Sequence, residues 1–277
     1  MQRALSTSIN AAPAIAIVFP GQGAQRPGMA RDFHEASAVA REVFAEASEA
    51  LNLDVGALCF EDDPRLDLTE YTQPAILTAE IAMARTLAAE HGLEATYFGG
   101  HSLGEYTALC AAGVIPLATA VRLARRRGAL MQAAVPPGRG AMAAVIAEGI
   151  DRRDLGLLDG LGVDVANRNS PDQIVISGAA EPVAEAIVCL EQLLTAAAVE
   201  HRVVPLNVSA PFHSRLMQGI EATFAAELRA AAPGFHPERA SAVTSNVSGA
   251  FHAPSADAII LALTRQRGVL AALSRAQ

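Results

Sequence analysis

A serine flanked by two glycines is the clearest chemical signal in this chain. Residues 100–104 read Gly-His-Ser-Leu-Gly, which matches the pattern G-x-S-x-G. In that pattern a sharp turn from a strand into a helix lifts a serine hydroxyl clear of a sheet. An apolar run precedes the motif and an Ala-rich segment follows it, as such a turn requires. The helix N-terminus offers free N–H groups and a positive dipole to an oxyanion, so we interpret Ser102 as a nucleophile.

A serine hydroxyl is a weak nucleophile and needs a neighbouring base. Among the seven histidines the best candidate is His213, which lies in a loop between an expected strand and an expected helix. His101 adjoins Ser102, but alternation along a strand would turn its side chain to the opposite face, which favours a supporting role. Four other histidines are interpreted as solvated or core imidazoles: His34, His91, His236 and His252.

An arginine on an apolar helix face is the third signal. In the helix expected over 117–133, positions 117, 120, 124, 127 and 131 hold Leu, Ala, Ala, Arg and Met and share one face. A buried cation is costly unless it meets an anion. The guanidinium of Arg127 could hold a substrate carboxylate through two parallel hydrogen bonds. An internal salt bridge to Asp or Glu is the alternative.

Composition narrows the classes of function. The 277 residues carry a formal net charge of -8, which argues against a nucleic-acid binder. Every basic residue is Arg, so a catalytic Lys, a Schiff base and a Walker-type phosphate Lys are excluded. The apolar run from Ala11 to Phe19 is too short to span a membrane. The cysteines lack the spacing of a zinc site, so we expect no metal and interpret all three as reduced packing residues of a cytoplasmic protein: Cys59, Cys110 and Cys189.

The catalytic candidates must be positioned by alternating strands and helices. We expect a buried strand over 14–19, helices over 37–52 and 72–91, a strand over 96–100, and helices over 103–112 and 117–133. After a linker at 136–140, shorter units follow: a strand over 141–147, a helix over 151–160, a hairpin of 164–167 with 173–177, a helix over 181–198 and a strand over 201–208. The chain then returns with a helix over 214–231 and a strand over 242–245.

The second group of units has the βαββαβ order of a ferredoxin-like fold. We therefore predict an α/β protein. An α/β-hydrolase-like large domain with a parallel sheet comprises residues 1–136 and 206–277. A ferredoxin-like α+β subdomain, residues 137–205, is inserted into it.

Several blocks taken together resemble the malonyl-CoA:acyl carrier protein transacylases and the acyltransferase domains of polyketide synthases. They occur in the family's order and cover the chain from about 14 to 266. The blocks are FPGQGAQ at 19–25, TQP at 72–74, GHSLGEY at 100–106, RG at 127–128, NRNSP at 167–171 and SAPFHS at 209–214.

The resemblance implies a two-step transfer through an acyl-serine. Ser102 would take the malonyl group from malonyl-CoA, with His213 as base and then acid, and the phosphopantetheine thiol of an acyl carrier protein would receive it. The family places oxyanion-hole N–H groups at Gln22 and Leu103 and the malonyl-binding arginine at Arg127. It orients the histidine with a carbonyl near the position of Gln266.

Further expectations follow from the same resemblance. The substrate-binding residues would be Gln73, His101, Asn169 and Phe212 beside Arg127, with Phe212 lining the pocket around the acyl α-carbon. We expect no cofactor, no nucleic-acid or membrane partner, a monomer, and a carrier protein of fatty acid or polyketide synthesis. Because carrier proteins are acidic, a local arginine patch is expected, and its candidates are Arg125, Arg126, Arg202 and Arg215.

Two other functions stay open on the same scaffold. A trans-acting acyl hydrolase would pass the acyl group from Ser102 to water, but it would gain nothing from a buried Arg127 when clearing neutral chains. A non-catalytic scaffold protein is the other alternative. Residues 267–277 do not resemble the family's next block, so we expect weaker stability and activity than in a longer relative.

Overall fold

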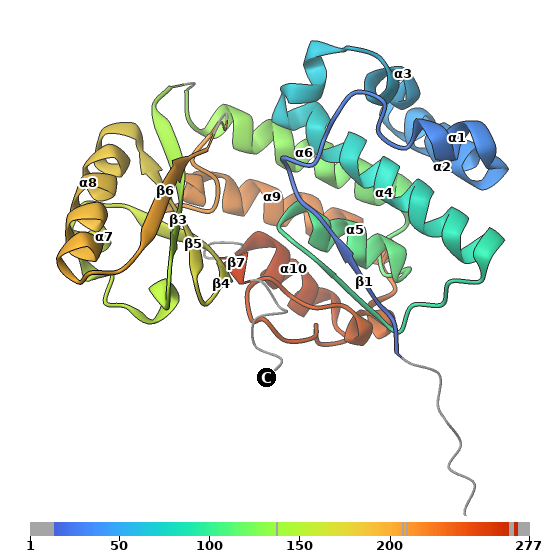
Figure 1. Cartoon of the computed structure of the whole chain (residues 1–277). Helices are drawn as coiled ribbons and strands as arrows, with labels where there is room; N and C mark the ends of the chain where they lie inside the picture. Colours follow the sequence, from blue (N-terminus) through green and yellow to red (C-terminus); the bar gives the residue numbers. More distant parts are fainter. Residues whose placement is uncertain (1–13, 137, 207, 209, 266–268, 271–277) are drawn as a thin grey trace, which may run out of the picture.

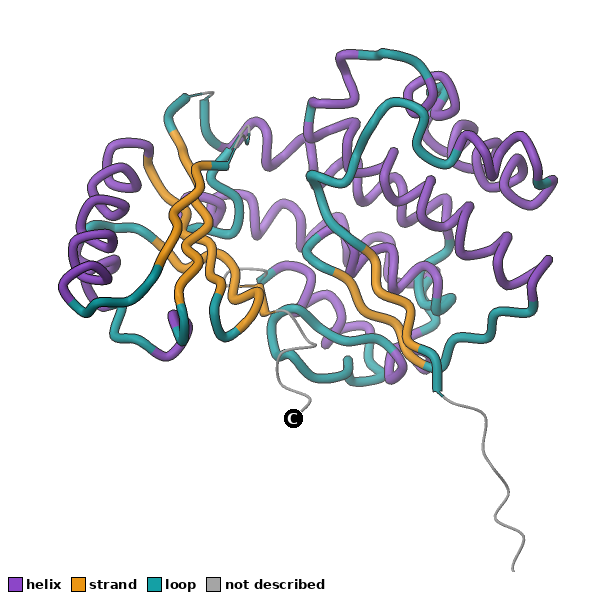
Figure 2. The backbone as a smooth tube through the Cα atoms, in the orientation of Figure 1, coloured by secondary structure: helices purple, strands orange, loops and turns teal. Residues whose placement is uncertain are grey.

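The computed structural model describes residues 14–136, 138–206, 208, 210–265 and 269–270. The described chain has two parts, and their strands form two separate sheets (Figure 2). Within the described residues, none of the helices has the length and apolar character needed to cross a bilayer.

The first part consists of helices around a short parallel sheet (Figure 1). Strand β1 pairs in parallel with β2, from Ala16 beside Tyr97 to Phe19 beside Gly100. The helices bury one continuous apolar core, to which α2, α4, α5 and α6 contribute most. Its elements are β1 Ala16–Phe19, α1 Arg31–Ala36, α2 Ala38–Leu51, α3 Val55–Phe60, the 3₁₀ helix Pro64–Asp67, α4 Thr69–His91, β2 Tyr97–Gly100, α5 Leu103–Ala111 and α6 Leu117–Ala134.

The second part is a sheet with helices on one side. Its strand order is β6-β3-β5-β4-β7, and the first four strands are antiparallel in the arrangement of a ferredoxin-like fold, as the sequence predicts. Helix α8 covers the sheet, and Leu190 and Leu194 meet Val145, Ile174 and Ile176 in a second core. Its elements are β3 Gly140–Ala147, the 3₁₀ helix Ile150–Arg152, α7 Gly156–Gly160, β4 Asp164–Ser170, β5 Gln173–Ala179, α8 Ala180–Ala196 and β6 His201–Pro205.

The chain then returns to the first part. A third apolar cluster joins the two parts, with Met131 of α6 and Phe212 packed against Met142 and Val175 of the second sheet. The remaining elements are the 3₁₀ helices Arg215–Met217, Ala232–Gly234 and Pro237–Ala242, α9 Gln218–Ala231, α10 Ala256–Thr264 and β7 Val269–Leu270, which pairs in parallel with β4.

Several expected elements differ from those observed. The strand expected over 14–19 is not buried throughout, since Ile15 is 38% and Val18 49% exposed. The helix expected over 151–160 is divided into one 3₁₀ turn and α7. The division lies at Asp154, which accepts a hydrogen bond (2.9 Å) from the N–H of Gly156, the first residue of α7.

Two more boundaries were wrong. The strand expected over 242–245 is only two isolated bridges, because the residues before it wind into a 3₁₀ helix that ends at Ala242. Helix α4 begins at Thr69, so Pro74 lies inside the helix rather than in its first turn. The expected tail over 267–277 lies outside the described residues apart from the two residues of β7.

Candidate active site

Ser102 occupies a strained turn between a strand and a helix. Strand β2 ends at Gly100, α5 begins at Leu103, and Ser102 between them has φ 55° and ψ −98°. A Cβ atom at Gly104 would collide with the carbonyl oxygen of Phe19 on β1, and one at Gly100 would collide with the backbone of Gly104. The two glycines therefore let helix and sheet approach closely enough to form the predicted elbow.

His213 lies directly beside the serine. Its Nε2 is 2.8 Å from Ser102 Oγ, and its side chain is buried. The loop that carries it is held by Ser214, whose hydroxyl donates to the Pro211 carbonyl (2.7 Å) and accepts from the Leu216 N–H (3.3 Å). This turn holds His213 at a positive φ of 59°. The structure therefore places beside Ser102 the histidine that the sequence favoured among seven.

Arg127 reaches the same hydroxyl from α6. Its Nη2 donates to Ser102 Oγ (3.0 Å), its Nη1 donates to Gln73 Oε1 (2.9 Å), and the side chain is 4% exposed. Burial lowers the pKa of the guanidinium, but from a value so high that the group stays charged. A Cβ at Gly128 would collide with the Thr69 carbonyl, so this glycine permits the close crossing that brings Arg127 to Gln73.

These side chains line one cavity of about 230 Å³ between the two parts of the chain. Its lining combines polar and apolar side chains, which suits an acyl group that carries a charge. The polar lining is Gln22, Gln73, His101, Ser102, Arg127, Asn167, Asn169, Gln173 and His213. The apolar lining is Leu103, Met131, Met142, Ala144, Val175, Leu206, Val208 and Phe212.

Backbone N–H groups at the start of α5 are mostly engaged. The Gly104 N–H donates to the His101 carbonyl (3.0 Å), and the Glu105 N–H donates to the Ser102 carbonyl (3.3 Å). The Ser102 N–H donates to Asn246 Oδ1 (2.6 Å). Leu103 stands at the first helical position, where an N–H has no intrahelical acceptor. Its N–H therefore has the right place for an oxyanion donor.

His101 lies in the bend after β2, so strand alternation does not turn it away from the cavity. Its Nε2 is 3.0 Å from Asn169 Oδ1 and 3.5 Å from Asn167 Nδ2. Burial lowers the pKa of His101, which keeps the imidazole neutral near pH 7. The expectation that it faces away from the serine was wrong.

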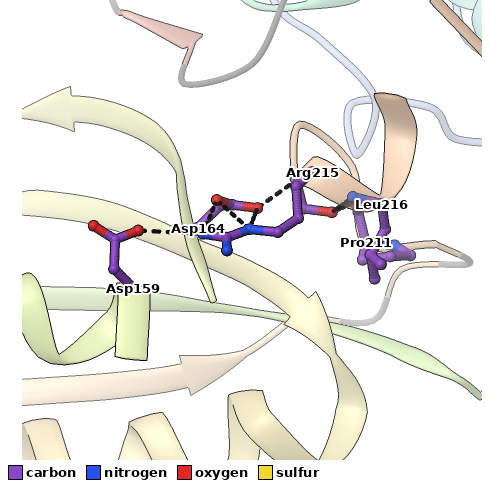
Figure 3. Close-up of polar contacts among 6 residues, drawn as sticks. Asp159, Asp164, Pro211, Arg215 and Leu216 are labelled. Atoms are coloured by element: carbon purple, nitrogen blue, oxygen red, sulfur yellow. Dashed lines mark hydrogen bonds and ion pairs between the residues drawn. The ribbon is translucent and has the colours of Figure 1, made fainter. Parts of the chain in front are cut away.

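Three of the four arginines proposed for a carrier-protein patch are held by carboxylates. Arg125 pairs with Glu70 at 3.0 Å and Arg126 with Glu227 at 3.0 Å. Arg215 contacts Asp164 at 2.8 Å and Asp159 at 3.2 Å (Figure 3). The fourth, Arg202, is exposed on β6. Three of the candidates therefore already engage carboxylates, and a carrier-protein patch at these arginines stays a prediction.

Residues 16–269 match the acyl transferase domain family. The chain belongs to this family. Over 219 residues it is 44% identical to malonyl CoA-acyl carrier protein transacylase of Escherichia coli O157:H7, covering 77% of this chain and 69% of that relative. The solved structure of the Coxiella burnetii malonyl CoA-acyl carrier protein transacylase matches with a TM-score of 0.83 at 35% identity, over 93% of this chain and 80% of that one.

A second solved structure is a type II PKS acyl-carrier protein in complex with its malonyl-transacylase. It matches with a TM-score of 0.82 at 39% identity, over 93% of this chain and 82% of that one. These matches confirm the predicted fold class and family. The boundaries at 137 and 205 stay a prediction.

Two asparagines in this acyl transferase site were not singled out from the sequence. Asn167 lines the cavity, although the sequence singled out only Asn169 from the same strand. Asn246 contacts the serine backbone from a loop 144 residues away in sequence. A buried asparagine is a signal in itself, but its burial was not visible in the sequence. Gln266 lies outside the described residues, and among the described residues no cluster of His, Cys, Asp and Glu could hold a metal ion.

Proposed function

We propose that Ser102 and His213 transfer a malonyl group from malonyl-CoA to the phosphopantetheine thiol of an acyl carrier protein. The chain is thus an acyl carrier protein S-malonyltransferase of either fatty acid or polyketide synthesis. The observation that carries the proposal is the convergence on one hydroxyl: His213 Nε2 at 2.8 Å and the Arg127 guanidinium at 3.0 Å. A nucleophile, a base and a carboxylate-binding cation meet inside one cavity.

In the first half-reaction Ser102 Oγ attacks the thioester carbon while His213 Nε2 takes the hydroxyl proton. The negative charge on the former carbonyl oxygen is stabilised by the N–H groups of Leu103 and Gln22. The C–S bond then breaks, the coenzyme A sulfur takes the proton from His213, and malonyl remains as an ester of Ser102.

The second half-reaction reverses these roles. The carrier thiol gives its proton to His213 and attacks the ester carbon, and the Ser102 oxygen leaves and recovers the proton. Once Ser102 is acylated, its oxygen is part of an ester, and the Arg127 guanidinium binds the malonyl carboxylate instead of the serine hydroxyl. Gln73 Oε1 holds the other side of the guanidinium at 2.9 Å and so keeps it in place.

The competing hydrolase and scaffold functions predict other products. The purified chain is incubated with malonyl-CoA and an acyl carrier protein bearing phosphopantetheine, and malonyl-carrier and free malonate are both quantified. We expect malonyl-carrier in large excess and neither product from Ser102→Ala. Free malonate as the main product would establish the hydrolase, and no turnover by the unaltered chain would establish the scaffold.

Location, assembly and cofactor requirement belong to the same proposal. We propose that the chain works in the cytoplasm as a monomer and needs no cofactor. In support of the location, the three cysteines are free, as is usual in a reducing compartment. Light scattering at micromolar concentration tests the monomer, and a mass of twice the chain under conditions of full activity would refute it.

A further inference from the structure

One side chain holds the backbone on both sides of the nucleophile. Asn246 Oδ1 accepts the Ser102 N–H at 2.6 Å, and its Nδ2 donates to the Gly100 carbonyl at 2.6 Å. The side chain is 1% exposed. An amide supplies a donor and an acceptor side by side, and neither an aliphatic side chain nor an ionised carboxylate can do so. The two partners also fix which end of the amide is oxygen.

Asn246 is in turn held by a buried acid and a buried imidazole. Glu105 Oε1 accepts the Asn246 N–H at 3.2 Å and the Nε2 of His252 at 2.8 Å. Glu105 is 0% and His252 5% exposed. Glu105 lies on α5, in the first turn after the serine, whereas His252 follows the tight turn that carries Asn246. The acid therefore fastens this loop to the helix of the nucleophile.

We propose that Asn246 is a positioning residue that holds Ser102 in its strained conformation, and that the Glu105–His252 pair holds Asn246 in place. The inference rests on the proposed function, since it concerns the same serine. Ser102 has φ 55°, which L residues rarely adopt, and such strain persists only where neighbours over-determine it. The two hydrogen bonds of Asn246 do so directly.

The same bonds also select the oxyanion donors. With its N–H engaged by Asn246, Ser102 presents that group to the loop rather than to the cavity, which leaves Leu103 to face a developing oxyanion. Loss of Asn246 leaves a part-buried N–H and a part-buried carbonyl without these partners. The elbow then relaxes, and a small displacement of a nucleophile lowers a rate steeply.

The test compares Asn246→Ala and Asn246→Asp with the unaltered chain. Rates of malonyl transfer are divided by the amount of Ser102 that is acylated after exhaustive labelling with malonyl-CoA, so that misfolded chains do not count. We expect the per-site kcat of Asn246→Ala to fall about 10- to 100-fold with little change in KM for malonyl-CoA.

Asn246→Asp adds a readout that a purely structural role would not give. A protonated Asp can donate to Gly100 and accept from Ser102, but an ionised one cannot donate and also faces Glu105. Among the titratable side chains of the described residues, Glu105 contacts this position, His252 contacts Glu105, and His213 and Arg127 lie beyond Ser102. We therefore divide the per-site transfer rate of Asn246→Asp by that of the unaltered chain. This ratio should rise about 10-fold as pH falls from about 8.5 to about 6.

Matched histidines test the supporting pair. His252→Ala should slow transfer severalfold, whereas His252→Gln, which keeps a donor for Glu105, should recover most of the rate. His236 provides the control, because it pairs with Glu238 at 3.7 Å on the surface, and His236→Ala should leave the rate unchanged.

The outcomes separate the two proposals. If the unaltered chain cannot be labelled at Ser102, the proposed function fails. If it is labelled and Asn246→Ala keeps its per-site rate within about twofold, or the Asn246→Asp ratio stays flat with pH, Asn246 does not position the nucleophile.

Discussion

At the scale of single residues, we expect Arg127 to determine which acyl group the site accepts. Its guanidinium lies 3.0 Å from the nucleophile and is held by Gln73 rather than left mobile. It also lies 5.2 Å from the Tyr106 ring, whose face favours a cation. A charge fixed so close to the reacting atom stabilises only acyl groups that carry an anion of their own.

Arg127→Ala should therefore slow malonyl transfer while sparing a neutral acyl group. Losing a charged hydrogen-bond partner of a buried anion costs about 2 to 5 kcal/mol. We expect kcat/KM for malonyl-CoA to fall accordingly and that for acetyl-CoA to change little or to rise. Steady-state rates with both CoA esters measure the two kcat/KM values. An equal fall in kcat/KM for both esters would show that Arg127 is a structural residue.

Phe212 should restrict the acyl α-carbon. Its ring is buried in the cavity wall directly before His213. A methyl group that clashes in a packed site costs about 1 to 3 kcal/mol, so malonyl should be preferred to methylmalonyl by roughly 10- to 200-fold. Competition between the two CoA esters measures the ratio, and Phe212→Ala should reduce it. Comparable rates in the unaltered chain would refute this.

A site residue could be predicted from the sequence where a local pattern surrounds it. Ser102 and Arg127 each carry a local pattern, an elbow and an apolar stripe, and His213 has a loop context. Asn246, Glu105 and His252 have no such pattern. Their contacts join α5 to a loop more than 140 residues away, and only the fold brings them together.

At the scale of elements, α4 and α5 meet through a buried acid. Thr107 of α5 donates to Glu80 Oε2 on α4 at 2.6 Å, while Glu80 Oε1 has no hydrogen-bond partner among the described residues. Burial raises the pKa of Glu80 from 4.5 to about 8. The folded chain therefore holds this proton more tightly than the unfolded chain does.

The sign of the pH effect follows from that difference. The stabilising contribution of the protonated Glu80 is complete below about pH 4.5 and is lost as pH rises to about 8. Glu80→Gln keeps an acceptor for Thr107 and cannot ionise. At about pH 8 it should therefore raise the free energy of unfolding by on the order of a few kcal/mol, and Tm with it. At about pH 5 the gain should be much smaller.

Thermal melts at about pH 5 and about pH 8 measure the Tm change caused by Glu80→Gln. Glu42→Gln on the exposed face of α2 is the control. A Tm difference for Glu80→Gln that is the same at both pH values would show that Glu80 is not protonated in the fold.

Elements with a sustained periodic pattern were predicted more accurately than turns. Helices α2, α6 and α8 lie within two residues of their predicted bounds because each has a sustained apolar face. The 3₁₀ turns around Asp154 and Ala242 were missed, since one side-chain hydrogen bond or one short winding decides them. Strand β7 exists through its pairing with β4, and no pattern in the nearby sequence predicts that pairing.

At the scale of the whole molecule, the site lies where two cores meet. The third cluster and an ion pair join them: the Arg215 N–H and guanidinium both contact the Asp164 carboxylate, at 2.5 Å and 2.8 Å (Figure 3). Arg215 comes two residues after His213, whereas Asp164 begins β4 of the second sheet. The base is thus connected to both halves of its cavity.

Asp164→Ala should change activity more than stability. A partly exposed ion pair contributes about 1 kcal/mol or less, so Tm should shift by only a few degrees. The rate should fall severalfold because the loop of His213 loses its attachment to β4. Arg126→Ala, which removes the similarly exposed pair with Glu227, should change Tm comparably without slowing transfer. Equal effects of both variants on the rate would contradict a link through Arg215.

Between the two half-reactions we expect a malonyl group to be bound covalently to Ser102. The direct measurement is acid trapping: radiolabelled malonyl-CoA is added without carrier protein, the reaction is quenched, and the peptides are separated. We predict one labelled peptide, the one that contains Ser102, and no label in Ser102→Ala. Undiminished labelling of Ser102→Ala, or a label on another residue of the unaltered chain, would contradict the account.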